Sequence, residues 1–124
     1  MYPDDMKYSA EHEWVRMDGN IAEIGITDFA RDSLGDVVFV DLPETGAKVE
    51  QFAKFGEIES VKAVSDLFSP ISGKIIEINR GVVDNPSVIN DDPHRSGWLM
   101  KVEITDQSQL DELMDSEAYK SMLA

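Results

Sequence analysis

The feature that most limits the fold of this chain is its series of short β-prone runs, each ended by turn residues. Strands are expected at 13–17, 21–26, 37–40, 55–60, 64–68, 74–78 and 98–104. Asp18-Gly19-Asn20 predicts a hairpin between the first two, because these residues tolerate positive φ. The continuous apolar run 37–40 is typical of a strand buried on both faces. The pattern therefore predicts a mainly β protein.

Two places in the chain favour short helices instead. Thr27 or Asp28 can cap a helix that ends at Gly35. In the tail, apolar residues recur at helical spacing, which predicts one helix capped by Asp106 and a second that starts at Asp115 or at the next residue. No linker-like or low-complexity tract interrupts the pattern, so we expect a single domain over residues 1–124.

Composition excludes several kinds of function. The chain has no cysteine, which excludes disulfides, a zinc knuckle and a thiol nucleophile. With only His12 and His94 as histidines, no transition-metal site is expected. A net charge of −14 repels nucleic acid and anionic membranes. The same charge suits docking on basic partner proteins, although solubility alone would also explain it.

The N-terminal residues Met1–Asp5 lack the basic and apolar regions of a signal peptide. No apolar run approaches the ~20 residues that span a membrane. A bacterial cytoplasm is therefore the expected location, with the mitochondrial matrix as the alternative for a processed form.

One internal similarity suggests two related halves. The segment 43–50 resembles 70–77: proline, glycine, an apolar residue and glutamate coincide at a spacing of 27 residues. Each copy follows a β-prone run that contains a phenylalanine. Chance recurrence of Pro-x-x-Gly turns explains the similarity equally well.

Lys62 lies between two β-prone runs, among carboxylates, in a turn without Gly, Pro or Asn. A lysine at such a turn is presented to solvent and to any enzyme that binds the hairpin. Its amine is protonated at neutral pH, and acylation removes that charge. Spacing alone favours an ordinary surface lysine in an acidic patch, since exposed lysines are common.

The residues around this lysine extend the argument. The stretch 59–73, Glu-Ser-Val-Lys-Ala-Val-Ser-Asp-Leu-Phe-Ser-Pro-Ile-Ser-Gly, resembles the lipoylation motif of glycine cleavage H proteins. Further blocks are similar to that family in the same order, at 8–14, 25–30, 34–43, 88–90, 92–93, 97–99 and 117–119. Phe68 replaces a tyrosine that the family often has.

This resemblance implies a small barrel-sandwich hybrid fold and a monomeric, non-catalytic lipoyl carrier, with lipoic acid in amide linkage to Lys62. It implies that the arm takes the aminomethyl group of glycine from glycine decarboxylase, a pyridoxal-phosphate enzyme, to an aminomethyltransferase that uses tetrahydrofolate. Dihydrolipoyl dehydrogenase, with FAD, then reoxidises the arm, and a lipoate ligase or lipoyl transferase attaches it. No thiol of the chain competes with the arm.

The resemblance also implies further site residues. The aminomethylated arm carries an amine, so we expect a carboxylate-lined pocket formed by Glu13 and Asp66, with Glu11 as a further candidate. Glu13 could equally be a solvent-facing strand residue, and Trp14 is expected in the core. The recognition hairpin comprises Lys62 and its neighbours Glu59, Ser60, Val61 and Ala63.

Three alternatives stay open. A lipoyl or biotinyl domain of another complex would share the lysine, although biotin carriers have methionines where Val61 and Ala63 stand. A lipoyl relay protein of lipoate assembly would also use Lys62. An acidic interaction module would carry no modification, and intact mass distinguishes it.

Overall fold

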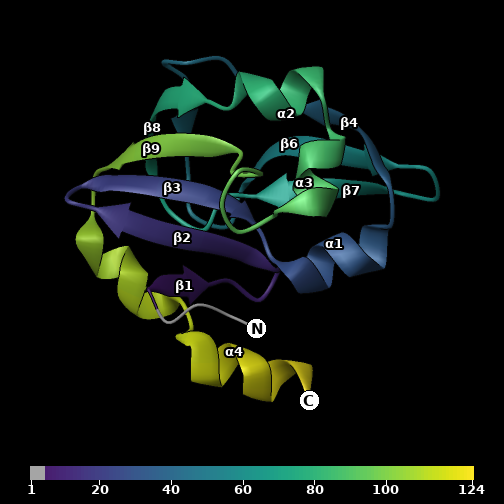
Figure 1. Ribbon diagram of the computed structural model, residues 1–124. Coiled ribbons are helices and arrows are strands. Elements are labelled where there is room, and N and C mark those ends of the chain that lie inside the picture. The colour runs from purple at the N-terminus through teal and green to yellow at the C-terminus, as the bar shows by residue number, and fades with distance from the viewer. Residues whose placement is uncertain (1–4) are drawn as a thin grey trace.

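The computed structural model describes residues 5–124 as two antiparallel sheets with short helices at their edges (Figure 1). Residues 1–4, on which the argument against a signal peptide rests, lie outside the described residues. No helix in the described part of the chain is long and apolar enough to cross a membrane.

The larger sheet has six strands in the order β1-β2-β3-β9-β8-β5. Its strands are β1 (Met6–Tyr8), β2 (Glu13–Asp18), β3 (Ile21–Ile26), β9 (Met100–Ile104), β8 (Gly73–Ile78) and β5 (Lys48–Val49). β2 and β3 form the predicted hairpin, which pairs Asp18 with Ile21 and places Gly19 in the left-handed region at φ 63°.

The smaller sheet has the order β4-β6-β7, with β4 at Val37–Asp41, β6 at Lys54–Ser60 and β7 at Val64–Phe68. The β6–β7 hairpin projects from the body of the molecule, at the right in Figure 1. The predicted burial of 37–40 on both faces is wrong, because Val38 and Phe39 are 51% and 53% exposed. A register shift between Val37 and Phe39 turns both side chains outward.

Helix α1 (Asp28–Leu34) begins and ends where the sequence indicates: the Thr27 hydroxyl accepts from the Ala30 amide, and Gly35 is the C-cap at φ 76°. In the tail, Asp106 caps a 3₁₀ helix, η1 (Gln107–Glu112), and Asp115 caps α4 (Ser116–Leu123). Helices α2 (Arg80–Asp84) and α3 (Ser87–Asp91) were not predicted, since five residues are too few to show a helical period.

Apolar packing divides the interior into three clusters. One lies along the inner face of the larger sheet, and a second joins the smaller sheet to α1, α2 and α3. The third packs β1 and β2 against α4 and contains Met6, Tyr8, Trp14 and Tyr119. Each fully buried Leu or Ile contributes about 1.5–3 kcal/mol, so these clusters hold the helices on the sheets.

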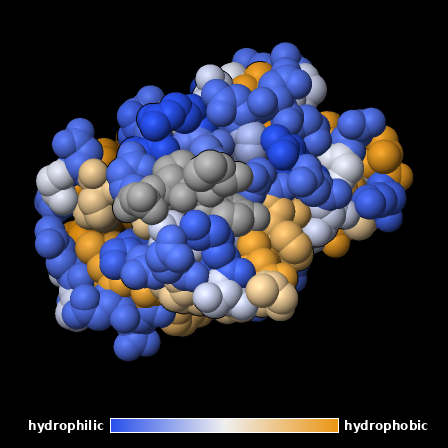
Figure 2. All heavy atoms as spheres, turned by 60° about the horizontal axis from the view of Figure 1, so that its bottom comes forward, coloured by the Kyte–Doolittle hydropathy of each residue, from blue (hydrophilic) through white to orange (hydrophobic). Residues whose placement is uncertain are grey.

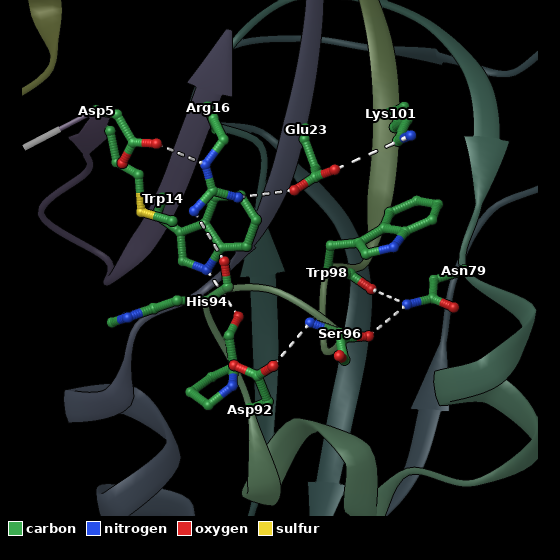
Figure 3. A network of polar contacts seen from close by, with 12 residues as sticks. Asp5, Trp14, Arg16, Glu23, Asn79, Asp92, His94, Ser96, Trp98 and Lys101 are labelled. Atoms are coloured by element: carbon green, nitrogen blue, oxygen red, sulfur yellow. Dashed lines mark hydrogen bonds and ion pairs between the residues drawn. The ribbon is translucent and has the colours of Figure 1, made fainter. Parts of the chain in front are cut away.

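A network of polar contacts connects the 92–98 loop to the larger sheet (Figure 3). Arg16 donates to Glu23 at 2.9 Å and to the His94 carbonyl at 3.0 Å. The Trp14 indole, fully buried as expected, donates to the Pro93 carbonyl at 3.0 Å. The loop is thereby tied to β2, and Asn79 ties it to β8 by donating to the Ser96 and Trp98 carbonyls.

The two similar segments 43–50 and 70–77 follow comparable paths. Each leaves a strand of the smaller sheet, β4 or β7, and enters the larger sheet as β5 or β8, and these two strands pair with each other. Their glycines differ, because Gly46 has φ 97° whereas Gly73 has no positive φ. A relationship between the halves stays a prediction.

Candidate functional site

The β6–β7 turn presents Lys62 without the glycines that a two-residue hairpin loop usually needs. The Ser60 amide donates to the Ala63 carbonyl at 2.8 Å, which closes the turn over Val61 and Lys62. Among the described non-glycine residues, only His12 and Phe52 have positive φ, so neither loop residue is left-handed. The Ser60 hydroxyl instead accepts from the amides of Lys62, at 3.3 Å, and Ala63, at 3.1 Å.

Lys62 is exposed at the tip of this turn, and no ion pair holds its amine among the described residues. Its aliphatic stem extends over Gly35, where an added Cβ would lie 3.5 Å from Cε and 4.0 Å from Nζ. The backbone at the C-cap of α1 therefore lies against the aliphatic stem of the lysine. The arrangement is that of an accessible primary amine on a short, ordered loop.

The other members of the predicted recognition hairpin fall into two groups. Val61, at 69% exposed, Glu59 and Ala63 face solvent, and Val64 is 59% exposed beside them. Ser60 is 6% exposed and its hydroxyl makes hydrogen bonds within the turn, so its role is to set the conformation of the loop. In Figure 2 the face is mostly hydrophilic, with separate hydrophobic areas at its lower left, right of its centre and at its right edge, the side on which the hairpin projects in Figure 1.

A cleft of about 570 Å³ begins beside the turn and runs along β7. Its walls come from three places: the strand that follows Lys62, helix α1, and the residues that open β2. The three predicted pocket carboxylates, Glu11, Glu13 and Asp66, all line it, together with Ala63, Val64 and Phe68. Residues more than 50 positions apart in the sequence are thus brought to one cavity.

Glu13 lies at the closed side of this cleft and is 2% exposed, so the solvent-facing alternative is wrong. One carboxyl oxygen accepts from the Ser9 hydroxyl at 2.6 Å and the other from the Phe68 amide at 3.3 Å. Burial raises its pKa from 4.5 to about 8, although these two hydrogen bonds lower it and Glu11 raises it further. At neutral pH the side chain is therefore mostly a neutral acid.

Asp66 and Glu11 stand at the open side of the cleft, where both are exposed. Asp66 forms an ion pair with Lys54 at 3.2 Å, and Lys54 also contacts Glu57 at 2.8 Å. These two acceptors raise the pKa of the Lys54 amine. Since the side chains of Lys54 and Asp66 are each 47% exposed, this pair is easily exchanged for water or another cation.

His12 was weighed in the sequence only as a metal ligand, and the structure gives it a different setting. It has φ 71°, and its Nδ1 lies 2.7 Å from the Tyr119 hydroxyl. Tyr119 is in turn 2.8 Å from the Thr27 hydroxyl, and its ring stacks on Tyr8 at 4.8 Å. The His12 ring also packs against the Phe29 ring in a tilted arrangement, with their centroids 4.6 Å apart, and burial lowers the pKa of His12. Helix α4 thus fixes the backbone between Glu11 and Glu13 through a contact of residues 107 positions apart, which no local pattern signals.

The arrangement offers an amine that can be acylated and, beside it, a cleft with one neutral and two exposed carboxyl groups. No group of three or more potential metal ligands forms in the part of the chain that is described. A long side chain attached at Lys62 could lie along β7, with its polar end near Glu13 and its apolar part against Phe29, Leu34 and Leu67. The residues present therefore fit an acyl arm with a polar or cationic end.

Comparison with known proteins agrees with this geometry. The family model described as "Glycine cleavage H-protein" matches residues 6–124. A glycine cleavage system H protein of Carboxydothermus hydrogenoformans is 52% identical over 121 residues, which cover 98% of this chain and 93% of the relative. Another from Halalkalibacterium halodurans is 50% identical over 122 residues, or 98% and 95% of the two chains. The crystal structure of a glycine cleavage system H protein from Mycobacterium marinum is similar with a TM-score of 0.91 and 41% identity, covering 98% of each chain.

Proposed function

The chain belongs to the glycine cleavage H-protein family, and from that premise we propose that Lys62 is the residue to which its lipoyl group is attached. Proteins of this family are non-catalytic lipoyl carriers of the glycine cleavage system, with the lipoyl group on a lysine. The chain accordingly acts as a carrier in glycine catabolism. When bound, the lipoyl group supplies the disulfide chemistry that a cysteine-free chain lacks.

The observation that carries the assignment to Lys62 is its position at the tip of the β6–β7 turn beside the cleft. The turn residues are ordered by the Ser60 hydroxyl, while the lysine side chain is exposed and has no ion-pair partner among the described residues. A modifying enzyme can therefore reach the amine without unfolding any part of the hairpin. The exposed neighbours Glu59, Val61 and Ala63 form the surface that such an enzyme recognises.

We assign the cleft to the loaded arm, with Glu13 as the group that meets its amine. Glu13 holds a proton on its carboxyl while the cleft contains water, because burial disfavours the carboxylate. A cation at hydrogen-bond distance reverses this preference, so Glu13 can lose its proton and form an ion pair. Asp66 and Glu11 at the open side attract the cation, and the apolar walls keep water away from it.

The partner enzymes are those of the glycine cleavage system. We assign them as glycine decarboxylase with pyridoxal phosphate, aminomethyltransferase with tetrahydrofolate, dihydrolipoyl dehydrogenase with FAD, and a lipoate ligase or lipoyl transferase that loads Lys62. The net charge of −14 supports docking on basic surfaces around their active sites. We place the chain in the bacterial cytoplasm as a single carrier domain, on the strength of its bacterial relatives and their matching lengths.

Intact mass tests the attachment site. The purified apo chain, incubated with a lipoate ligase, lipoate and ATP, is expected to gain one lipoyl mass, and peptide mapping should place it on Lys62. Lys62→Arg should gain none, whereas Lys74→Arg, at an exposed strand lysine, should behave as wild type. A lipoyl group on another lysine, or none on the wild type, would refute the assignment.

The loaded chain then separates the carrier from the relay protein. Mixed with glycine decarboxylase, the aminomethyltransferase and the dehydrogenase, it is expected to support release of carbon dioxide from glycine. Transfer of lipoyl groups to other proteins without any glycine decarboxylation would instead favour the relay role.

A further inference from the structure

We propose that Asn90 is a positioning residue that holds the Lys62 turn in the shape that the lipoylating enzyme recognises. This inference rests on the proposed attachment at Lys62. Asn90 lies on α3, 28 positions from the lysine in sequence (90 − 62), and it contacts the turn only through an intermediate segment.

That intermediate segment is Gly35–Val37, between α1 and β4. It supports the turn in three ways. The Asp36 carbonyl accepts from the Val61 amide at 3.0 Å, Val37 pairs with Ser60, and Gly35 lies under the aliphatic stem of Lys62. The position of the turn therefore depends on the position of these three residues.

Asn90 fixes the segment from its other side. Its Oδ1 accepts from the Val37 amide at 2.9 Å, and its Nδ2 donates to the Gly35 carbonyl at 2.7 Å. Arg31 of α1 in turn donates to the Asn90 carbonyl at 3.2 Å. One side-chain amide thus makes the donor and acceptor contacts that a neighbouring strand would otherwise make.

The fold explains why such a contact is needed here. β4 is an edge strand, with β6 on one side and no strand of the described residues on the other. Its register shifts between Val37 and Phe39, directly after the segment, so few ladder hydrogen bonds fix this end of the strand. An edge strand with an irregular ladder can shift its register relative to its neighbour. Asn90 opposes such a shift, because it makes hydrogen bonds with the two backbone groups whose partners the shift would change.

Loss of this contact should affect recognition more than chemistry. The lysine amine itself is untouched, but only part of the population would hold the turn in the recognised shape, and the apparent affinity falls with that fraction. Two hydrogen bonds are lost, so we expect the KM for the chain in lipoylation to rise by roughly three- to tenfold with little change in kcat.

The experiment compares Asn90→Leu with Asn79→Leu. Asn79 is a suitable control because its amide also donates to two backbone carbonyls, those of Ser96 and Trp98, which belong neither to the hairpin nor to Gly35–Val37 (Figure 3). The initial rate of lipoylation by a lipoate ligase is measured against the concentration of each chain, and urea unfolding gives the stability of each. We expect the KM to rise for Asn90→Leu alone. Equal KM values for the two variants would overturn the proposal.

A second variant decides the question even if Asn90→Leu folds poorly. In Asn90→Asp the carboxylate can accept from Val37 but repels the Gly35 carbonyl, whereas the protonated acid can donate to it as the amide does. The amide resonance of Val61 should therefore shift at pH 8 and return toward its wild-type position as the pH falls below the pKa of the new carboxyl. A Val61 resonance that is unchanged at both pH values would also overturn the proposal.

The two proposals fail in distinguishable ways. If the lipoyl group is found on another lysine, the attachment assignment is wrong, and the Val61 resonance still shows whether Asn90 orders the turn. If Lys62 is modified and the Asn90 variants match the control, the attachment assignment holds and the role of Asn90 is refuted.

Discussion

At the scale of single residues, Glu13 is the side chain whose behaviour departs most from its ordinary chemistry. It is 2% exposed and its pKa is raised to about 8. The raised pKa means that the folded protein binds this proton more tightly than the unfolded chain does. Burial of the carboxyl in a functional cleft therefore has a consequence for stability that can be measured in the apo protein.

We predict that the free energy of unfolding decreases as pH rises through the window between the ordinary pKa of 4.5 and about 8. The contribution of Glu13 is complete below that ordinary value and is lost as pH passes the raised one, with a slope of up to about 1.4 kcal/mol per pH unit. Glu13→Gln should flatten this slope, because the amide keeps no titrating proton.

Urea unfolding midpoints at several pH values from 5 to 8 check this prediction. The difference between variant and wild type is the relevant quantity, since His12 and His94, whose pKa values are lowered by burial, titrate in both proteins. Glu44→Gln, at an exposed position outside the cleft, should keep the wild-type slope. Parallel profiles for wild type and Glu13→Gln would contradict the prediction.

The residues of the site were predictable to different degrees. Lys62 and the three carboxylates were named from ordered family-like blocks, and the structure brings Glu11, Glu13 and Asp66 to one cleft. The burial of Glu13 was not predictable, because it depends on Ser9 and on the backbone of Phe68. Asn90 and His12 lie in family-like blocks, but nothing in the sequence predicts their contacts, since their partners lie more than 50 positions away.

At the scale of elements, the contact between β2 and β3 shows how closely packing constrains the site. Gly25 pairs with Trp14, and a Cβ added at Gly25 would lie 2.5 Å from the indole ring. The same indole holds the 92–98 loop through Pro93. Glu13 is adjacent to Trp14, so the position of the indole also constrains a carboxyl group that lines the cleft beside Lys62.

We predict that Gly25→Ala destabilises the protein by about 3 kcal/mol or more, at or beyond the upper end of overpacking costs, because both partners are fully buried. Trp14→Phe leaves space for the added methyl group. The double variant should therefore be more stable than the sum of the two single effects implies. Urea unfolding of the four proteins in this cycle measures the coupling, and strictly additive effects would contradict the proposed contact.

The helices and strands were also predictable to different degrees. β2, β3, β7, α1 and α4 were predicted to within a residue or two, because each has its own period and cap. β1, β5, α2 and α3 were missed, since segments of two to five residues are held by their neighbours and carry no period of their own. The outward turn of Val38 and Phe39 depends on a register shift with β6, which a continuous apolar run does not reveal.

At the scale of the whole molecule, charge is the dominant property. The chain carries 25 acidic and 11 basic side chains, and several of the ion pairs among the described residues lie at the surface, where each contributes little. The remaining like charges repel one another, which disfavours the compact state, and the same field attracts basic partners.

We predict opposite effects of salt on stability and on docking. Raising sodium chloride from about 10 mM to about 150 mM shortens the Debye length from roughly 30 Å to 8 Å, so self-repulsion is screened and the unfolding temperature should rise. The KM of a partner enzyme for the loaded chain should increase over the same range, because steering weakens. Differential scanning calorimetry and steady-state kinetics check the two effects. An unfolding temperature that falls with salt would contradict the first, and a KM independent of salt would contradict the second.

Local patterns in the sequence were enough to predict the mainly β architecture, the capped helices, the absence of thiol chemistry and the position of Lys62 in a hairpin. These are local properties, which depend on hydrophobic periodicity, helix-capping residues and short motifs. The burial of Glu13, the position of its cleft beside the Lys62 turn, and the contacts of Asn90 with Gly35 and Val37 become apparent only in the folded chain. Those properties depend on backbone and side-chain groups that meet across long separations, and the free energy of such contacts exists only once the sheets and helices have packed.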